Sequence, residues 1–378
     1  MKLDSSGMRY LTNEDFRVLT AAEMGSKNHE VVPTQLIAQI AGLRGGAGVG
    51  NCIATLAKMN LIARVKNASY DGYRLTYGGY DYLAMKTFLN RKTAYSVGNQ
   101  IGVGKESDIV VVANEQGRKC VLKIHRLGRI SFRSVKNNRD YLKNRQSASW
   151  MYLSRLAAQK EYMFMKALHG AGFNVPEPID NSRHCILMSL IKGYPMRQLK
   201  SHEDPSVLYA SLMAFIVNLA NHGLIHCDFN EFNIMILDDP PSDDELFVVI
   251  DFPQCVSIDH VDAERYFARD VECIRRFFAR KLGYDSDDYP RFKRDVKRVA
   301  SLDADVGASG FSKKMAKDFE KAIAASREQG EGEGDFAAGS GDEAEESDAS
   351  DASDASAASD TSAASAASAA SDTASPPA

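Results

Sequence analysis

Residues 224–237 read LIHCDFNEFNIMIL, and residues 248–254 read VVIDFPQ. His226, Asp228 and Asn233 form the pattern H-x-D-x-x-x-x-N, and Asp251 follows Asn233 by eighteen positions. These polar residues stand beside apolar runs that look like buried strands. Burying such groups without partners costs about 2–7 kcal/mol each. The pattern therefore predicts residues that bind a ligand rather than a purely structural segment.

The order and spacing of Asp228, Asn233 and Asp251 are typical of phosphoryl transfer from ATP. That reaction needs the phosphates held, a divalent metal placed and the acceptor oriented. We expect Asp228 to orient or deprotonate the acceptor. Asn233 and Asp251 would hold Mg²⁺, because this ion prefers oxygen ligands. ATP and Mg²⁺ are therefore the expected cofactors.

A glycine-containing turn, IGVGKESD at residues 101–108, lies between two predicted strands. Gly102 and Gly104 would let the backbone approach the phosphates, and Ser107 could donate a hydrogen bond to them. The turn lacks the third glycine of G-x-G-x-x-G, and Glu106 after Lys105 replaces the Ser or Thr of a Walker A loop. This signal is weak without the motif downstream.

Lys123 lies in the middle of an apolar strand, CVLKIH at residues 120–125. A lysine there needs a charged partner, unless the strand is at an edge and the side chain reaches water. Glu161, on a long predicted helix at residues 148–172, is the expected partner. The alternative is an exposed helical glutamate.

The first ninety residues have the order of a winged-helix domain. Three helices, TNEDFRVLTAAEMG, VPTQLIAQIAG and VGNCIATLAKMN, precede two alternating strands, LIARV and YDGYRLT, and a fourth helix closes the unit. Thr12 or Asn13 could cap the first helix, whereas Pro33 and Gly42 bound the second. The run GGAGVGN at residues 45–51 lacks a βαβ context, so we predict a tight turn between helices.

The charge is distributed unevenly. All 46 Lys and Arg residues precede residue 331, whereas 12 of the 50 Asp and Glu residues lie at or beyond it, which leaves residues 1–330 with a net charge of +8. A basic body suggests a polyanionic partner such as RNA, with a solubilising surface as the alternative. The most basic run carries Arg126, Arg129, Arg133, Lys136, Arg139, Lys143 and Arg145. The Ser/Ala/Asp-rich end is predicted to be disordered.

The six cysteines form no C-x-x-C pair, so we expect free thiols rather than disulfides or a zinc site. No apolar run approaches twenty residues, and no signal sequence is apparent. The sequence is therefore expected to be soluble and intracellular, without a membrane partner.

Together these motifs and their domain order resemble the RIO family of atypical protein kinases, in its winged-helix subfamily. The resemblance covers about residues 8–295 and is carried by GNQIGVGKESDI, LKIHRLGR, NRDYLKNR, LIKGYP, LANHGLIHCDFNEFNI and VIDFPQ. It implies an ATP pocket between two lobes, with a hinge that begins at Met188 and adenine bonded to the backbone near Ser189 and Ile191.

The resemblance also implies an α+β fold with defined boundaries. A winged-helix domain (1–91) precedes a minimal bilobal kinase-like domain (92–295), with an N-lobe at about 92–188, a hinge at 188–193 and a C-lobe at about 194–295. A partly helical extension (296–330) and a disordered acidic tail (331–378) follow. In the cell, the resemblance implies a cytoplasmic serine/threonine kinase or ATPase, with shuttling through the nucleus as a further expectation. It would act in late maturation of the small (40S) ribosomal subunit, with precursor subunits, their rRNA and other assembly factors as partners.

Three positions depart from related kinases. Cys227 stands where conventional kinases have an arginine and the subfamily usually has glycine, and Ser189 stands where the family often has glutamate. Asp251 is followed by Phe252 and Pro253, with no Ala-Pro-Glu motif afterwards. Ordinary peptide phosphorylation is therefore less expected than ATP hydrolysis that drives a conformational step.

Two alternatives share parts of this pattern. A small-molecule phosphotransferase of the aminoglycoside or choline type also has H-x-D-x-x-x-x-N, but the winged helix and the missing substrate-binding insertions disfavour it. The other is a winged-helix nucleic-acid-binding regulator with a non-catalytic kinase domain. Every catalytic position is filled, so loss of catalysis has no support in the sequence.

Overall fold

The computed structural model describes residues 3–43, 46–65, 70–104, 106–127, 146–240 and 245–304, without the side chains of residues 46, 47 and 146–149. The tail, most of the 296–330 extension, Lys105 and the basic run beyond residue 127 therefore lie outside the described residues. None of the described helices is long and apolar enough to cross a membrane. All six cysteines are free, and only Cys273 is not fully buried.

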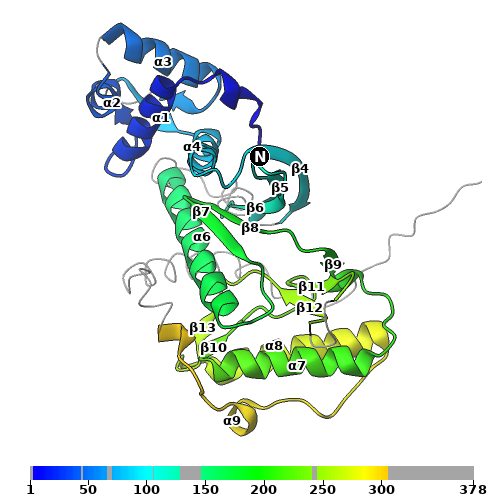
Figure 1. Cartoon of the computed structure of the whole chain (residues 1–378). Coiled ribbons are helices and arrows are strands. Elements are labelled where there is room, and N and C mark those ends of the chain that lie inside the picture. The colour runs from blue at the N-terminus through cyan, green and yellow to red at the C-terminus, as the bar shows by residue number, and fades with distance from the viewer. Residues whose placement is uncertain are drawn as a thin grey trace, which may run out of the picture. The chain divides into compact units, whose positions relative to one another are not determined.

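The winged-helix domain has the predicted helices and two-stranded hairpin in the predicted order, and it also has a short helix η1 and a third strand β1 that the sequence analysis did not predict (Figure 1). Its strands form one antiparallel sheet in the order β1-β3-β2. A Thr12–Asp15 capping box starts the first long helix, and Gly42 ends the second at φ 59°, a left-handed conformation that glycine adopts at little cost. The elements are η1 (Ser6–Tyr10), α1 (Asn13–Gly25), β1 (Val32–Pro33), α2 (Thr34–Ala41), α3 (Gly46–Lys58), β2 (Ile62–Arg64), β3 (Gly72–Leu75) and α4 (Tyr77–Asn90).

The prediction for the glycine run at residues 45–51 was wrong in part. Helix α3 begins at Gly46, so most of the run forms the first turns of a helix rather than a loop. Val49 and Cys52, which the predicted helix already contained, are buried in the winged-helix core, and this packing holds a helix that extends back over Gly46 and Gly48 despite the low helix propensity of glycine.

Helix α4 joins two hydrophobic cores. Tyr82 and Leu83 pack in the winged-helix core, whereas Met85 and Phe88 pack with Leu122 and other residues of the N-lobe sheet. The predicted boundary at residue 91 thus follows a helix that both domains use.

The N-lobe is a five-stranded antiparallel sheet in the order β4-β5-β6-β8-β7, with a long helix packed along it (Figure 1). Strand β6 lies at the centre of this sheet. All of its residues except Lys119 are buried. Its elements are β4 (Ser96–Val103), β5 (Ser107–Ala113), β6 (Lys119–His125), α6 (Gln146–Gly170), β7 (Pro178–Ser182) and β8 (Cys185–Ser189).

The C-lobe places short strands beside two helices, α7 and α8, which lie side by side (Figure 1). Two small antiparallel sheets, β12-β11-β9 and β10-β13, hold the ends of the catalytic segments. The elements are β9 (Gly193–Pro195), η3 (Met196–Gln198), α7 (Pro205–Asn221), β10 (Leu224–Ile225), β11 (Ile234–Leu237), β12 (Phe247–Val249), β13 (Val256–Ser257), α8 (Ala263–Phe277), η4 (Phe278–Leu282) and α9 (Phe292–Asp295).

The first residues of the predicted extension belong to the C-lobe. The backbone amides of Val299 and Leu302 donate to the carbonyls of Asn221 and His222 at the end of α7, and Leu302 joins the C-lobe core. Residues 296–304 therefore continue the domain beyond the predicted limit at 295.

Candidate active site

Lys123 is the centre of a buried ion cluster. Its Nζ donates to Oε1 of Glu161 and to Oδ1 of Asp251, each at 2.7 Å. Burial by itself would lower the pKa of Lys123, but the carboxylates of Asp251 and Glu161 raise it. The strand lysine and helix glutamate predicted as partners thus meet, and Lys123 keeps its positive charge in the interior.

Asp251 lies where β12 has ended and the chain turns sharply. Its φ of 72° is in the left-handed region, which is uncommon for a residue other than glycine and concentrates at functional sites. Burial would raise the pKa of Asp251, but the nearby Lys123 charge and hydrogen bond lower it. The side chain is 36% exposed, so an ionised carboxylate faces the solvent-accessible side of Lys123.

Asp228 and Asn233 are joined by the loop between β10 and β11. Asn233 Nδ2 donates to Oδ2 of Asp228 at 2.8 Å and to its carbonyl at 2.9 Å, while Asn230 Nδ2 donates to Oδ1 at 2.9 Å. Burial raises the pKa of Asp228, although the hydrogen bond from Asn233 opposes this. The carboxylate is oriented by two amides and poised to accept a proton.

Two side-chain oxygens of the site accept no hydrogen bond from the described residues, and they suit a hard divalent cation. They are Oδ2 of Asp251 and Oδ1 of Asn233. Among the residues that the structure describes, no group of three or more His, Cys, Asp or Glu side chains is arranged to hold a metal ion. Mg²⁺ needs no such cage, since it is commonly held by one or two protein oxygens, substrate phosphates and water. The donor set therefore fits the predicted metal.

The glycine turn, except Lys105, and the hinge lie among the described residues. Gly104 N donates to the Ser107 carbonyl at 2.7 Å and closes the turn between β4 and β5, which also contains Glu106, whereas Gly102 lies within β4 opposite Ile109. At the other edge of the sheet, Met188 is buried and Ser189 exchanges two hydrogen bonds with the Glu177 backbone.

The backbone of Ile191 differs from that of Ser189. Its amide donates no hydrogen bond to any residue that the structure describes. The Ser189 amide already has a partner in Glu177. An adenine donor–acceptor pair at the hinge would therefore use the Ile191 amide rather than that of Ser189.

Helix α8 supports the catalytic loop, and the sequence did not reveal this. Asp270 accepts hydrogen bonds from the amides of Cys227 (2.8 Å) and Phe229 (3.1 Å), and Arg269 donates to the Cys227 carbonyl. Burial raises the pKa of Asp270 to about 6. An acidic residue on an amphipathic helix carries no local signal for this role, because its partners lie about forty positions away.

Two histidines also belong to the site. His125 Nε2 lies 2.8 Å from Oε2 of Glu161, within ion-pair distance but without hydrogen-bond alignment. His226 is buried between the rings of Phe229 and Phe252, and burial lowers its pKa to about 4. His226 is therefore neutral at pH 7 and acts as packing for the loop.

Arg126 is not available to RNA, contrary to its predicted place in the basic run. Its guanidinium makes a bidentate pair with Asp81 of α4, with both contacts at 2.7 Å, and lies 3.3 Å from Asp108. His184 Nε2 lies 2.8 Å from the same Asp81 carboxylate. Arg126 is 4% exposed, so it links the winged helix to the N-lobe.

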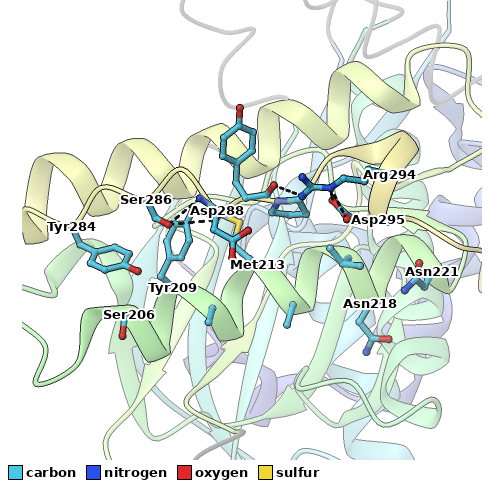
Figure 2. Close-up of a pocket in the computed structure, with 15 residues that line it drawn as sticks. Ser206, Tyr209, Met213, Asn218, Asn221, Tyr284, Ser286, Asp288, Arg294 and Asp295 are labelled. Carbon is cyan, nitrogen blue, oxygen red and sulfur yellow. Dashed lines mark hydrogen bonds and ion pairs between the residues drawn. The ribbon is translucent and has the colours of Figure 1, made fainter.

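A separate groove of about 520 Å³ lies along α7, away from these residues (Figure 2). Tyr209 and Met213 form part of one wall, and residues 284–295 form the other. Its charged pair, Arg294 and Asp295, is bonded internally, and Arg294 also donates to the Tyr289 carbonyl. None of the predicted site residues lines this groove, so chemistry rather than cavity size identifies the active site.

Comparisons with known families agree with this arrangement. A family model described as "RIO domain" matches residues 108–291, and one described as "Rio2, N-terminal" matches residues 8–91. The two matches occur in the predicted order, with the Rio2 N-terminal region before the RIO domain.

Individual relatives match over most of the chain. A serine/threonine-protein kinase RIO2 from Saccharomyces cerevisiae is 61% identical over 333 residues, covering 83% of this chain and 78% of that protein. A serine/threonine-protein kinase rio2 from Schizosaccharomyces pombe is 56% identical, covering 85% of this chain and 92% of that protein.

A solved structure is also similar. The crystal structure of the Rio2 kinase-ADP/Mg²⁺-phosphoaspartate complex from Chaetomium thermophilum superposes with a TM-score of 0.79 at 61% identity. It covers 88% of this chain and all of that one.

Proposed function

The chain belongs to the Rio2 group of RIO-family atypical serine/threonine kinases, and we propose that it works mainly as a Mg²⁺-dependent ATPase in late maturation of the small ribosomal subunit. The kinase class follows from the family. The ribosomal role and the predominance of ATP hydrolysis are the proposal.

One observation supports the ATP site most directly. Lys123 lies 2.7 Å from Glu161 and 2.7 Å from Asp251, although the three residues come from distant segments of the chain. In protein kinases a strand lysine paired with a helix glutamate contacts the phosphates, and an aspartate after a C-lobe strand holds the metal. The similar complex from Chaetomium thermophilum contains ADP and Mg²⁺, which supports the same ligands here. When bound, Mg²⁺ would neutralise phosphate charge beside Asp251 and Asn233.

The remaining residues supply binding and proton transfer. Lys123 would bind the phosphates, with Glu161 fixing its position. Asp228, held by Asn230 and Asn233, would accept the proton of the attacking water or hydroxyl. The adenine would bond to the hinge at Ile191, and the backbone at Gly102 and Gly104 would approach the phosphates.

The segment between Asp251 and α8 favours hydrolysis over peptide phosphorylation. Only residues 252–262 separate them, and they contain β13 as their one regular element. That segment is too short for an activation loop with a peptide-docking platform.

Asp251 is the proposed phosphoryl acceptor, because the similar complex contains a phosphoaspartate. Its carboxylate is ionised and partly exposed. A carboxylate oxygen would form a bond to the γ-phosphorus while the bond to the departing ADP oxygen breaks. Water activated by Asp228 would then hydrolyse the acyl phosphate and release inorganic phosphate.

The test uses γ-labelled ATP with the full chain. Wild-type protein should retain a label that hydroxylamine removes, and Asp251→Asn should retain none. Asp259→Asn, at an exposed ion pair with Arg298, is the matched control and should label like wild type. A label that persists in Asp251→Asn would exclude Asp251 as the acceptor.

The ribosomal role is supported by charge and by the family. Residues 1–330 carry a net charge of +8, and the chain has a winged helix, a fold that often contacts nucleic acid. Precursor small subunits, their rRNA and other assembly factors in the cytoplasm are the proposed partners. The small-molecule phosphotransferase and the non-catalytic regulator have no support among the relatives, which are serine/threonine kinases.

A further inference from the structure

The backbone of Cys227, immediately before Asp228, has an unfavourable conformation. Its φ is 66°, in the left-handed region that a Cβ atom disfavours. A residue other than glycine stays there only when its surroundings hold it. Since the next residue is Asp228, any relaxation of this backbone would rotate the proposed catalytic carboxylate.

Two adjacent residues of α8 hold this backbone from opposite sides. The carboxylate of Asp270 accepts the amides of Cys227 and Phe229, so both carboxylate oxygens are used. The guanidinium of Arg269 donates to the Cys227 carbonyl, the group whose direction changes most if φ leaves the left-handed region. Amide and carbonyl of one residue are thus fixed by neighbouring side chains.

A second arginine on the same helix serves as an internal comparison. Arg265 and Arg269 lie one turn apart, and each stacks on the ring of Tyr266, at 5.2 and 5.3 Å from its centroid. Arg265 pairs with Asp262 instead of contacting the loop. The two residues share charge, helix and aromatic partner, and they differ in the bond to Cys227.

We propose that Arg269 is a positioning residue for ATP hydrolysis, which holds Cys227 in its left-handed conformation through the carbonyl and thereby aims Asp228 at the attacking water. The inference rests on the proposed role of Asp228.

The first test measures steady-state ATP hydrolysis by the full chain. Arg269→Met should lower kcat about tenfold with little change in KM for ATP, because Arg269 contacts the backbone of the catalytic loop and is not one of the residues proposed to bind the nucleotide. Adding Cys227→Gly should restore most of kcat, since glycine adopts the left-handed conformation without the α8 contact. Adding Cys227→Ala, which also removes the thiol but keeps Cβ, should not restore it. Arg265→Met should behave like wild type.

A second readout does not need turnover. In the nucleotide-free protein, hydrogen exchange at the amides of Cys227 and Phe229 should be faster in Arg269→Met and unchanged in Arg265→Met. If Arg269→Met does not fold, Arg269→Lys retains a donor and should give a smaller loss of kcat that Cys227→Gly again restores.

Several results would overturn the inference. They are a wild-type kcat in Arg269→Met, equal rescue by alanine and glycine at position 227, or equal losses in Arg265→Met and Arg269→Met. Absence of ATP turnover in the wild type would instead contradict the proposed function, and the exchange measurement would still decide whether Arg269 holds the loop.

Discussion

Lys123 shows how a single charge can bind a substrate and stabilise the fold. Its side chain is 9% exposed and that of Glu161 is 1% exposed, so neither charge would be stable alone. Removing one partner of such a pair costs about 3–5 kcal/mol, since the other charge remains buried. The burial of both partners therefore makes Lys123 important for the stability of the fold as well as for ATP binding.

We expect Lys123→Met to lower ATP turnover by about 100-fold or more. It should also reduce the free energy of unfolding by about 3–5 kcal/mol, with Glu161 left beside only His125. Asp251→Asn should lose turnover equally but much less stability, since Asp251 is partly exposed. Denaturant unfolding and an ATPase assay measure both effects. Wild-type turnover in folded Lys123→Met would remove Lys123 from the site.

Asp270 should make stability depend on pH. Its pKa is raised to about 6 from an ordinary value of 3.8, so folding favours the protonated form. Its contribution is therefore fully present below about pH 4 and is lost as the pH rises through about 6, by on the order of 3 kcal/mol.

The comparison is with Asp270→Asn, which cannot ionise. As the pH rises from about 4 to 6, the wild type should lose free energy of unfolding relative to this variant. Above about pH 6 the difference should level off. A pH-independent difference would mean that Asp270 is ionised throughout this range.

At the scale of elements, α4 is the joint between the two domains. One face packs in the winged-helix core, another packs on the N-lobe sheet, and Asp81 between them receives the guanidinium of Arg126. Arg126 follows β6 directly, three residues after Lys123. The contact between α4 and Arg126 therefore lies only three residues along the chain from the lysine proposed to bind the phosphates.

Arg126→Met should destabilise the protein by about 3–5 kcal/mol, because it leaves the buried Asp81 carboxylate without its bidentate partner. Arg118→Met is the control, since Arg118 pairs with Glu177 at an exposed site, and it should leave the unfolding midpoint nearly unchanged. Thermal unfolding monitored by circular dichroism distinguishes them. Similar midpoints for the two variants would show that the Asp81 network adds no net stability.

At the scale of the whole molecule, we propose that binding to the precursor subunit and catalysis use different parts of the chain. Charged surfaces that contact phosphates bind independently of ATP hydrolysis. Turnover changes affinity only if ATP-bound and product-bound states bind the particle differently. We therefore expect ATP hydrolysis to drive release from the precursor subunit, and not joining.

Asp228→Ala should still bind ATP and still join precursor small subunits, but leave them slowly, because the step that Asp228 assists is blocked. Gradient sedimentation of tagged protein measures this, with Asp259→Ala as a control for an exposed aspartate. Absence of Asp228→Ala from precursor particles, or release as fast as wild type, would contradict the release model.

The sequence by itself determined the order of elements, the family and the identity of the residues that meet at the ATP site. These depend on local periodicity, capping and motif spacing, which short segments carry without their neighbours. The glycine run was the exception, since α3, packed in the winged-helix core, extends back to Gly46, where the sequence predicted a turn.

Only the tertiary structure decided which charges are buried and what each one contacts. In the sequence, Arg126 is one of several basic residues, and only the structure shows that it is buried against Asp81, 45 positions away. Arg269 and Asp270 contact the catalytic loop only because α8 packs against it. The physical reason is that a charge is stable in the interior only beside its partners, and those partners come from distant parts of the chain.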